Sequence, residues 1–143
     1  MQQHAKGMGS RRRAREAALQ VLYQIDLTAE DAEPALELYF QYLTAGDDAR
    51  EFAGELVRGC TANRDAIDAK IREVSRHWRL ERMARVDRNI LRLATFELLF
   101  LADVPRKVTL NEAVELAKRF GDEDSPAFVN GVLDRIASEL TKA

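Results

Sequence analysis

Arginine residues crowd the start of one helical stretch near the N-terminus. Four of the five residues from 11 to 15 are arginines, namely Arg11, Arg12, Arg13 and Arg15. The guanidinium group is a planar fork that makes bidentate, charge-assisted hydrogen bonds to phosphate. The helix dipole disfavours positive charge at a helix start, so solubility alone gives no reason to gather arginines there. The run therefore predicts an anion-binding patch, with RNA or DNA as the first candidate ligand.

The charge of the chain changes sign along its length. The 143 residues carry a formal net charge of -2, yet residues 1–20 hold five basic side chains against Glu16 alone. Residues 26–55 contain nine carboxylates and one arginine, and residues 58–92 contain ten basic and five acidic side chains. If the basic segments meet in space, they form one anion-binding surface. The alternative is that each segment is a solvated helix face, which would give the same charge pattern.

An aromatic residue accompanies the arginine run. Tyr23 and Leu19 fall on the helix face of Arg12 at about 100° per residue. Unstacked RNA bases favour aromatic side chains beside arginines, so this face suits single-stranded nucleic acid. His77 and Trp78 follow a second arginine-rich segment. They either flank a binding surface or anchor a loop by hydrophobic contact, and anchoring is the simpler interpretation.

Catalytic and metal chemistry has little support in the sequence. Cys60 is the single cysteine, and His4 and His77 are isolated, so the residues do not have zinc-ligand spacing. Residues 121–125 lack the ligand spacing of an EF-hand and fit a capped loop between helices. The chain has no Gly-rich phosphate loop and no nucleophile elbow. We therefore expect no enzymatic activity, no metal and no cofactor.

The elements that must position these residues are all predicted to be helices. Helical periodicity runs through almost the whole chain, without sustained strand alternation. The first helix is predicted to begin at Ser10 as N-cap, after a flexible tail of residues 1–9. Its apolar stripe consists of Ala14, Ala18, Val21, Leu22 and Ile25. Pro34 fits the first turn of a short second helix that ends near Leu43.

The remaining helices are predicted from caps and apolar faces. A third follows Asp47, with Phe52, Leu56, Val57 and Cys60 on one face, and Asn63 can cap a fourth. Residues 86–102 are apolar around the whole axis and predict a buried central helix, in which Glu97 needs a partner. Thr109 and Glu112 have capping-box spacing, Gly121 is a C-terminal stop, and Ser125 caps the last helix.

About seven helices with short loops predict a single all-α domain over residues 10–143. The expected architecture is two small helical bundles that share the long central helix. The N-terminus does not resemble a signal peptide, and the longest apolar run, Leu98–Ala102, is too short to cross a bilayer. These features predict a cytoplasmic protein.

Three blocks of sequence resemble the NusB family of bacterial transcription antitermination factors. The first is the arginine run, followed by the stretch from Ala18 to Tyr23. The second is Val86–Ala94, followed by Glu97 and Leu98. The third and most specific is Val108–Lys118, then Phe120–Gly121 and Phe128–Asp134. Together the blocks span about residues 10 to 140, and they occur in the family's order and at compatible spacing.

The resemblance implies a function and a set of contacts. NusB proteins bind boxA-type RNA in nascent transcripts, notably ribosomal RNA, together with a small-subunit ribosomal protein that acts as NusE. They join other Nus factors on RNA polymerase. Carried over to matching positions, the RNA-binding residues are Arg11, Arg12, Arg13, Arg15, Gln20, Tyr23, Asp124 and Phe128. Asp87 is the first position expected to contact the ribosomal protein. A homodimer that hides the RNA surface is left open.

Two alternatives to an RNA-binding antitermination factor are kept. The first is a helical protein–protein adaptor that touches RNA only weakly. The second is an RNA-targeting domain separated from a ribosomal RNA cytosine methyltransferase, because the same domain occurs at the N-terminus of such enzymes. A methyl-donor domain does not follow the helices in this chain, which favours the stand-alone factor.

Overall fold

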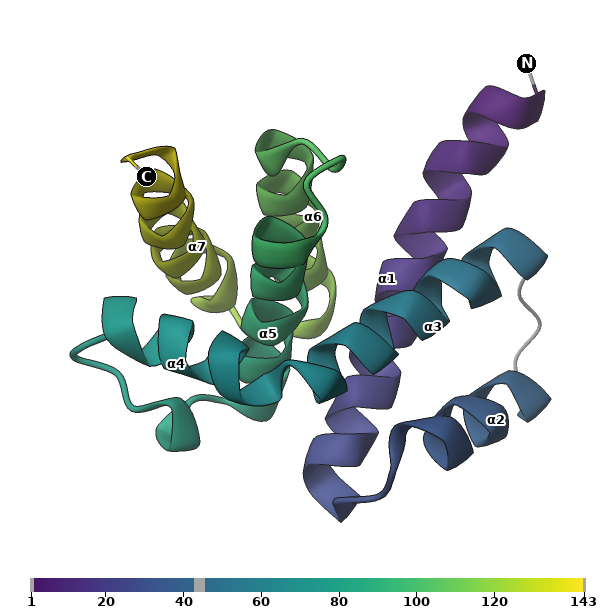
Figure 1. The fold of residues 1–143 in the computed structure, drawn as a ribbon, viewed down its shortest axis with the longest axis horizontal. Coiled ribbons are helices and arrows are strands. Elements are labelled where there is room, and N and C mark those ends of the chain that lie inside the picture. The colour runs from purple at the N-terminus through teal and green to yellow at the C-terminus, as the bar shows by residue number, and fades with distance from the viewer. Residues whose placement is uncertain (1, 43–45, 143) are drawn as a thin grey trace. The chain divides into compact units, whose positions relative to one another are not determined.

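The computed structural model describes residues 2–42 and 46–142, and in these ranges it contains seven α-helices and no strand (Figure 1). The all-α prediction is therefore confirmed. The helices, with a short 3-10 turn labelled η1, are α1 Gln2–Thr28, α2 Ala32–Tyr42, α3 Asp47–Ala62, α4 Arg64–Val74, η1 Leu80–Arg82, α5 Arg85–Phe100, α6 Arg106–Phe120 and α7 Ser125–Lys142. Their contacts divide the chain into two compact units, residues 1–62 and residues 63–143.

The first unit is built on α1, which packs against α3 and α2. Its interior contains the apolar stripe predicted for the first helix and the apolar face predicted for the third. These buried residues are Ala14, Ala18, Val21, Leu22 and Ile25 of α1, and Phe52, Leu56, Val57 and Cys60 of α3. The burial of both faces holds the N-terminal part of α1 against α3. The arginine run is consequently carried on a packed helix.

The start predicted for the first helix is wrong. α1 begins at Gln2, and Ser10 is a buried residue inside the helix. A serine N-cap contributes only about 1 kcal/mol, and residues 2–9 contain no proline to stop the helix from extending. The second helix begins at Ala32, close to its predicted start, and its predicted end near Leu43 lies outside the described residues.

The second unit is organised around α5, which packs against α4, α6 and α7. Every residue from Asn89 to Glu97 is buried, as predicted for a central helix. The helices against which α5 packs all lie in this unit. Arg92 of α5 forms a buried ion pair with Asp68 of α4, in which Arg92 Nε donates to Asp68 Oδ1 at 2.8 Å and Arg92 Nη2 donates to Asp68 Oδ2 at 3.1 Å.

The buried Glu97 has the partner that the sequence required, supplied by an unexpected residue. The Thr109 hydroxyl donates to Glu97 Oε1 at 3.0 Å, and both residues are buried. The capping box predicted at Thr109 is wrong, because α6 already begins at Arg106, directly after Pro105. The polar threonine therefore faces α5 and satisfies a carboxylate that would be costly to bury alone.

The loop between α6 and α7 caps the last helix through Asp122. Asp122 Oδ1 accepts hydrogen bonds from the amides of Asp124 at 2.9 Å and Ser125 at 3.2 Å. The Ser125 hydroxyl in turn accepts from the Asp122 amide at 3.0 Å. This reciprocal arrangement has the form of a capping box, with Asp122 in the role that the sequence assigned to Ser125. None of the described helices is both long and apolar enough to cross a membrane.

Candidate nucleic-acid interface

The arginine run divides into an exposed part and a buried part. Arg11, Arg12 and Arg13 are exposed on α1, whereas Arg15 is only 4% exposed. Three successive residues of a helix span about 200° of its circumference, so these arginines fan out around the axis. The structure therefore exposes three of the four guanidinium groups, while that of Arg15 is buried.

An aromatic ring from α3 lies under two of the arginines. The guanidinium carbon of Arg11 is 4.1 Å from the centroid of the Phe52 ring, and that of Arg15 is 5.5 Å away. Both distances fall within the range of a cation–π interaction. Phe52 is 7% exposed and belongs to the buried face of α3. A core phenylalanine thus fixes the position of Arg11 relative to the rest of the first unit.

Carboxylates of α3 lie close to Arg11. A small hollow of about 280 Å³ is lined by Arg11, Phe52, Asp48, Glu51 and Glu55. The three acidic residues are exposed and recur along one side of the helix. Their negative charge lowers the potential around Arg11. Arg12 and Arg13 do not line this hollow.

The other residues predicted on α1 are partly accessible. Gln20 is exposed and Tyr23 is half-buried. Tyr23 follows Arg12 by eleven positions, about three helical turns, so the two share one face about 16 Å apart. Leu19, which was expected on the exposed face of Arg12, is buried at 3% exposure. α1 contacts α2 as well as α3, and a helix packed against two others buries a wider stripe than one-third of its circumference.

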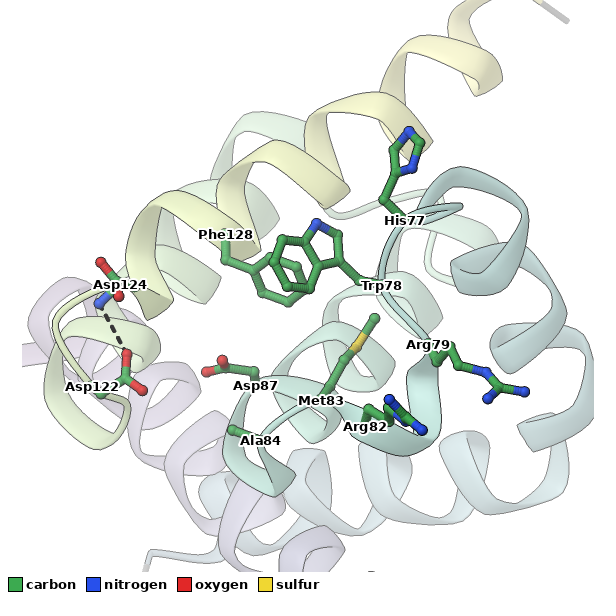
Figure 2. Close-up of a pocket in the computed structure, with 10 residues that line it drawn as sticks. All are labelled: His77, Trp78, Arg79, Arg82, Met83, Ala84, Asp87, Asp122, Asp124 and Phe128. Atoms are coloured by element: carbon green, nitrogen blue, oxygen red, sulfur yellow. Dashed lines mark hydrogen bonds between the residues drawn. The ribbon is translucent and has the colours of Figure 1, made fainter.

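The remaining predicted residues meet in a groove of the second unit. The groove has a volume of about 730 Å³ and is lined by residues of the α4–α5 connection, the start of α5, the α6–α7 loop and α7. Asp87, Asp124 and Phe128 all line it (Figure 2). Sequence reasoning assigned Asp87 to a protein partner and the other two to RNA. The structure places all three in one cavity.

Asp87 is the most unusual polar group of the groove. It is 8% exposed, and its Oδ1 atom has no hydrogen-bond partner among the described residues. Burial raises the pKa of the Asp87 carboxyl above its ordinary value of 3.8, and the nearby charge of Asp122 adds to this, while a hydrogen bond from Ser125 opposes it. An unsatisfied buried acceptor is rare and costly, so this oxygen is suited to a donor from another molecule.

The walls of the groove are held by the local structure described above. The Asp122 cap fixes Asp124 at the start of α7, and the Phe128 amide donates to the Asp124 carbonyl at 3.2 Å. Phe128 is half-buried, and its ring meets that of Trp78 in a T-shaped contact with 5.8 Å between centroids. Phe128 therefore presents part of its ring to the groove.

Sequence reasoning did not assign Arg79 or Arg82 to a site. It considered Trp78 only as a residue that either flanks a binding surface or anchors a loop, and all three line the groove. The interpretation of Trp78 as a hydrophobic loop anchor is wrong, because its side chain is 63% exposed. Both arginines are also exposed. The available signal in the sequence was an arginine-rich segment beside the single tryptophan. Only the fold shows that this tryptophan contacts Phe128.

Comparison with known proteins shows the family of the chain. The sequence profile of the NusB family matches residues 12–138. The chain belongs to the NusB family. A transcription antitermination protein NusB from Geobacter sulfurreducens is 54% identical, over 93% of this chain and 97% of the relative. The family resemblance noted from the three sequence blocks is therefore confirmed.

Solved NusB structures share the fold. A NusB structure from T. maritima superposes with a TM-score of 0.83 at 46% identity, over 90% of this chain and 91% of the other. A crystal structure of the antitermination factors NusB and NusE in complex with double-stranded RNA matches with a TM-score of 0.84 at 33% identity, over 92% of this chain and 98% of the other. NusB proteins of this fold thus include one captured with both RNA and NusE.

Proposed function

We propose that this protein is a cytoplasmic transcription antitermination factor that binds boxA-type single-stranded RNA in nascent transcripts, notably ribosomal RNA, together with the ribosomal protein NusE. Its membership of the NusB family and the similarity to a NusB–NusE–RNA complex support this function. The observation that carries the proposal is the exposed run Arg11, Arg12 and Arg13 on a helix of an otherwise acidic chain.

The RNA contacts follow from side-chain chemistry and exposure. Arg12 and Arg13 bind phosphates as bidentate donors, and Arg11 contributes from its position over Phe52. Tyr23 and Gln20 contact bases further along α1, and Arg15 adds positive potential from beneath the surface. In the second unit, Asp124 and Phe128 form the other RNA-facing element.

The protein partner is proposed to contact Asp87. A lysine or arginine of the ribosomal protein would donate to the Asp87 Oδ1 atom that lacks a partner and would neutralise a carboxylate that burial disfavours. When RNA and the partner bind together, the second contact forms within one complex at a high effective concentration. The overall affinity then exceeds that of either contact alone. The assembled complex would then join other Nus factors on RNA polymerase.

Fluorescence anisotropy of a labelled boxA-like RNA tests the proposal. The protein is titrated into this RNA and into a scrambled RNA, with and without NusE, at two salt concentrations. We expect a preference for the boxA-like strand that increases with NusE, and affinity that falls with salt. Equal, weak binding to both RNAs in every mixture would refute the proposal and leave a helical protein–protein adaptor.

A further inference from the structure

Three carboxylates of α3 border the arginine run on one side. α3 packs against α1 (Figure 1), and Asp48, Glu51 and Glu55 are exposed along it. Their spacing of three and four residues places them in a single row on one face of the helix. All three line the hollow of about 280 Å³ to which Arg11 also contributes. The positive surface of the arginine run therefore meets a negative row at Arg11.

Arg11 does not neutralise this row of carboxylates. Its guanidinium lies over the Phe52 ring, 4.1 Å from the centroid, and within the described ranges it forms no ion pair with the acidic residues of the hollow. The hollow has three carboxylates against one guanidinium, so its net charge is negative. A sphere of this volume is about 8 Å across, which equals about one Debye length at physiological salt. A phosphate bound by Arg11 would therefore be repelled by the carboxylates.

Two paths for an RNA strand lead away from the arginine run. One follows α1 from Arg12 to Tyr23, and Glu16 is the single carboxylate between these two residues in the sequence. The other leads over Arg11 onto α3 and meets three carboxylates. Binding through phosphates alone is insensitive to sequence and can take either path, whereas base contacts hold a strand on the path of Tyr23. Repulsion on the second path therefore acts mainly on strands that lack the base contacts.

We propose that Asp48, Glu51 and Glu55 are specificity determinants that repel RNA from the α3 side of Arg11 and confine it to the path along α1. Discrimination is a difference between two affinities, so weakening the incorrect complex increases it just as strengthening the correct complex does. This inference rests on the proposed RNA-binding function, and it assigns a role to residues that the family resemblance did not include.

The double variant Glu51→Gln and Glu55→Gln tests this role. Glutamine keeps the size and helix propensity of glutamate and removes its charge. Asp48 is left in place, because an acidic residue in the first turn also stabilises α3. At low salt, anisotropy should show about threefold tighter binding of the scrambled RNA and a change of less than about 1.5-fold for the boxA-like RNA. High salt should abolish the difference, because it screens the repulsion.

The matched control combines Asp65→Asn with Asp103→Asn. Both are exposed carboxylates that do not line the hollow, and the net charge of the chain changes by the same amount. This variant should discriminate between the two RNAs as the wild type does. Replacing Glu51 and Glu55 with lysine should reverse the charge of the row and tighten binding of the scrambled RNA further than glutamine does. Urea unfolding checks that all three variants are folded.

The remaining outcomes overturn the inference. An equal change in affinity for both RNAs, or no change for either, would show that the carboxylates do not contribute to specificity and would leave the proposed function intact. Weaker NusE binding in the glutamine variant, with unchanged RNA binding, would assign the carboxylates to a protein contact. Absence of RNA binding in the wild type, with or without NusE, would refute the proposed function and this inference together.

Discussion

The guanidinium of Arg11 on α1 lies 4.1 Å above the ring of Phe52 on α3, and the guanidinium of Arg15 approaches the same ring at 5.5 Å. The sequence pattern identifies Phe52 only as part of a core face. In the structure, its ring also orients Arg11 of the arginine run. Leucine would serve the core almost as well but has no π-system. The choice of residue at position 52 thus links packing in the first unit to its surface charge.

Replacing Phe52 with leucine should weaken RNA binding about threefold to fivefold, because each exposed cation–π contact contributes about 0.5–1 kcal/mol. The change in free energy of unfolding should stay below about 1.5 kcal/mol, since the substitution nearly conserves volume. Phe52→Tyr keeps the ring and should bind RNA normally. Anisotropy and urea unfolding measure the two effects.

A matched control exists in the same unit. Arg50 lies 5.0 Å from the ring centroid of Phe40, so Phe40→Leu removes a similar cation–π contact that does not involve the arginine run. Equal losses of RNA affinity in Phe40→Leu and Phe52→Leu would show that the effect comes from stability and not from the position of Arg11.

The double substitution Arg12→Ala and Arg13→Ala should reduce RNA affinity and also flatten its salt dependence. Each lost phosphate contact lowers the slope of log affinity against log salt by about 0.7 for a single strand. The free energy of unfolding should change by no more than about 0.5 kcal/mol, because both side chains are exposed. Anisotropy titrations at four salt concentrations give the slope.

The control removes two charges elsewhere. Arg106 and Lys107 are adjacent, exposed cations at the start of α6, the end of that helix remote from the groove. Their replacement by alanine should leave the slope unchanged. A slope that falls equally in both double variants would point to the net charge of the chain instead of the arginine run.

The helical fold was predictable because it depends on patterns that are local in the sequence. The apolar stripe of α1 from Ala14 to Ile25 shows the 3.6-residue period directly, and the apolar residues on every side of α5 predict a buried helix. Caps were less predictable. Ser10 and Thr109 have the chemistry of N-terminal caps but lie inside helices, where tertiary contacts outweigh about 1 kcal/mol of local preference.

The candidate site was only partly predictable for a related reason. The exposed arginines are adjacent in the sequence, so their cluster was visible in the chain. The groove brings together Trp78, Asp87 and Phe128 from three separate segments, and no local pattern reports that proximity. The burial of Arg15 likewise depends on α3, which supplies Phe52.

Two glycines should respond to alanine in opposite directions. A Cβ atom at Gly121 would lie 2.5 Å from the Ser125 side chain and 2.8 Å from the Ala117 carbonyl oxygen, so Gly121→Ala should destabilise the protein by about 1–3 kcal/mol. A Cβ atom at Gly131, inside α7, would meet nothing within 4 Å. Gly131→Ala should stabilise by about 0.5–1 kcal/mol, since glycine is a poor helix former.

Urea unfolding of the two glycine variants under identical conditions measures both effects. Each variant serves as the control for the other, because the chemical change is the same and only the surroundings differ. Destabilisation by Gly131→Ala would contradict the open surroundings of that position, and a neutral Gly121→Ala would show that the α6–α7 loop moves without cost.

Asp87→Asn should make the protein more stable at neutral pH and less able to bind its partner. The pKa of Asp87 is raised in the folded state, chiefly by burial, above the ordinary value of 3.8. The folded state therefore binds the proton more tightly than the unfolded state does, and stability falls as pH rises from 3.8 through the raised value. Asparagine does not titrate, so the variant escapes this loss.

The gain in stability from Asp87→Asn should be greatest at neutral pH and should shrink as pH approaches 3.8, because asparagine keeps the polar atoms but not the charge that burial disfavours. Urea unfolding at several pH values measures it, with Asp65→Asn, an exposed carboxylate of α4, correcting for the change in net charge. A difference that stays constant with pH would contradict the assignment. A stabilised variant with weaker NusE binding would show that the carboxylate is kept for recognition at the expense of stability.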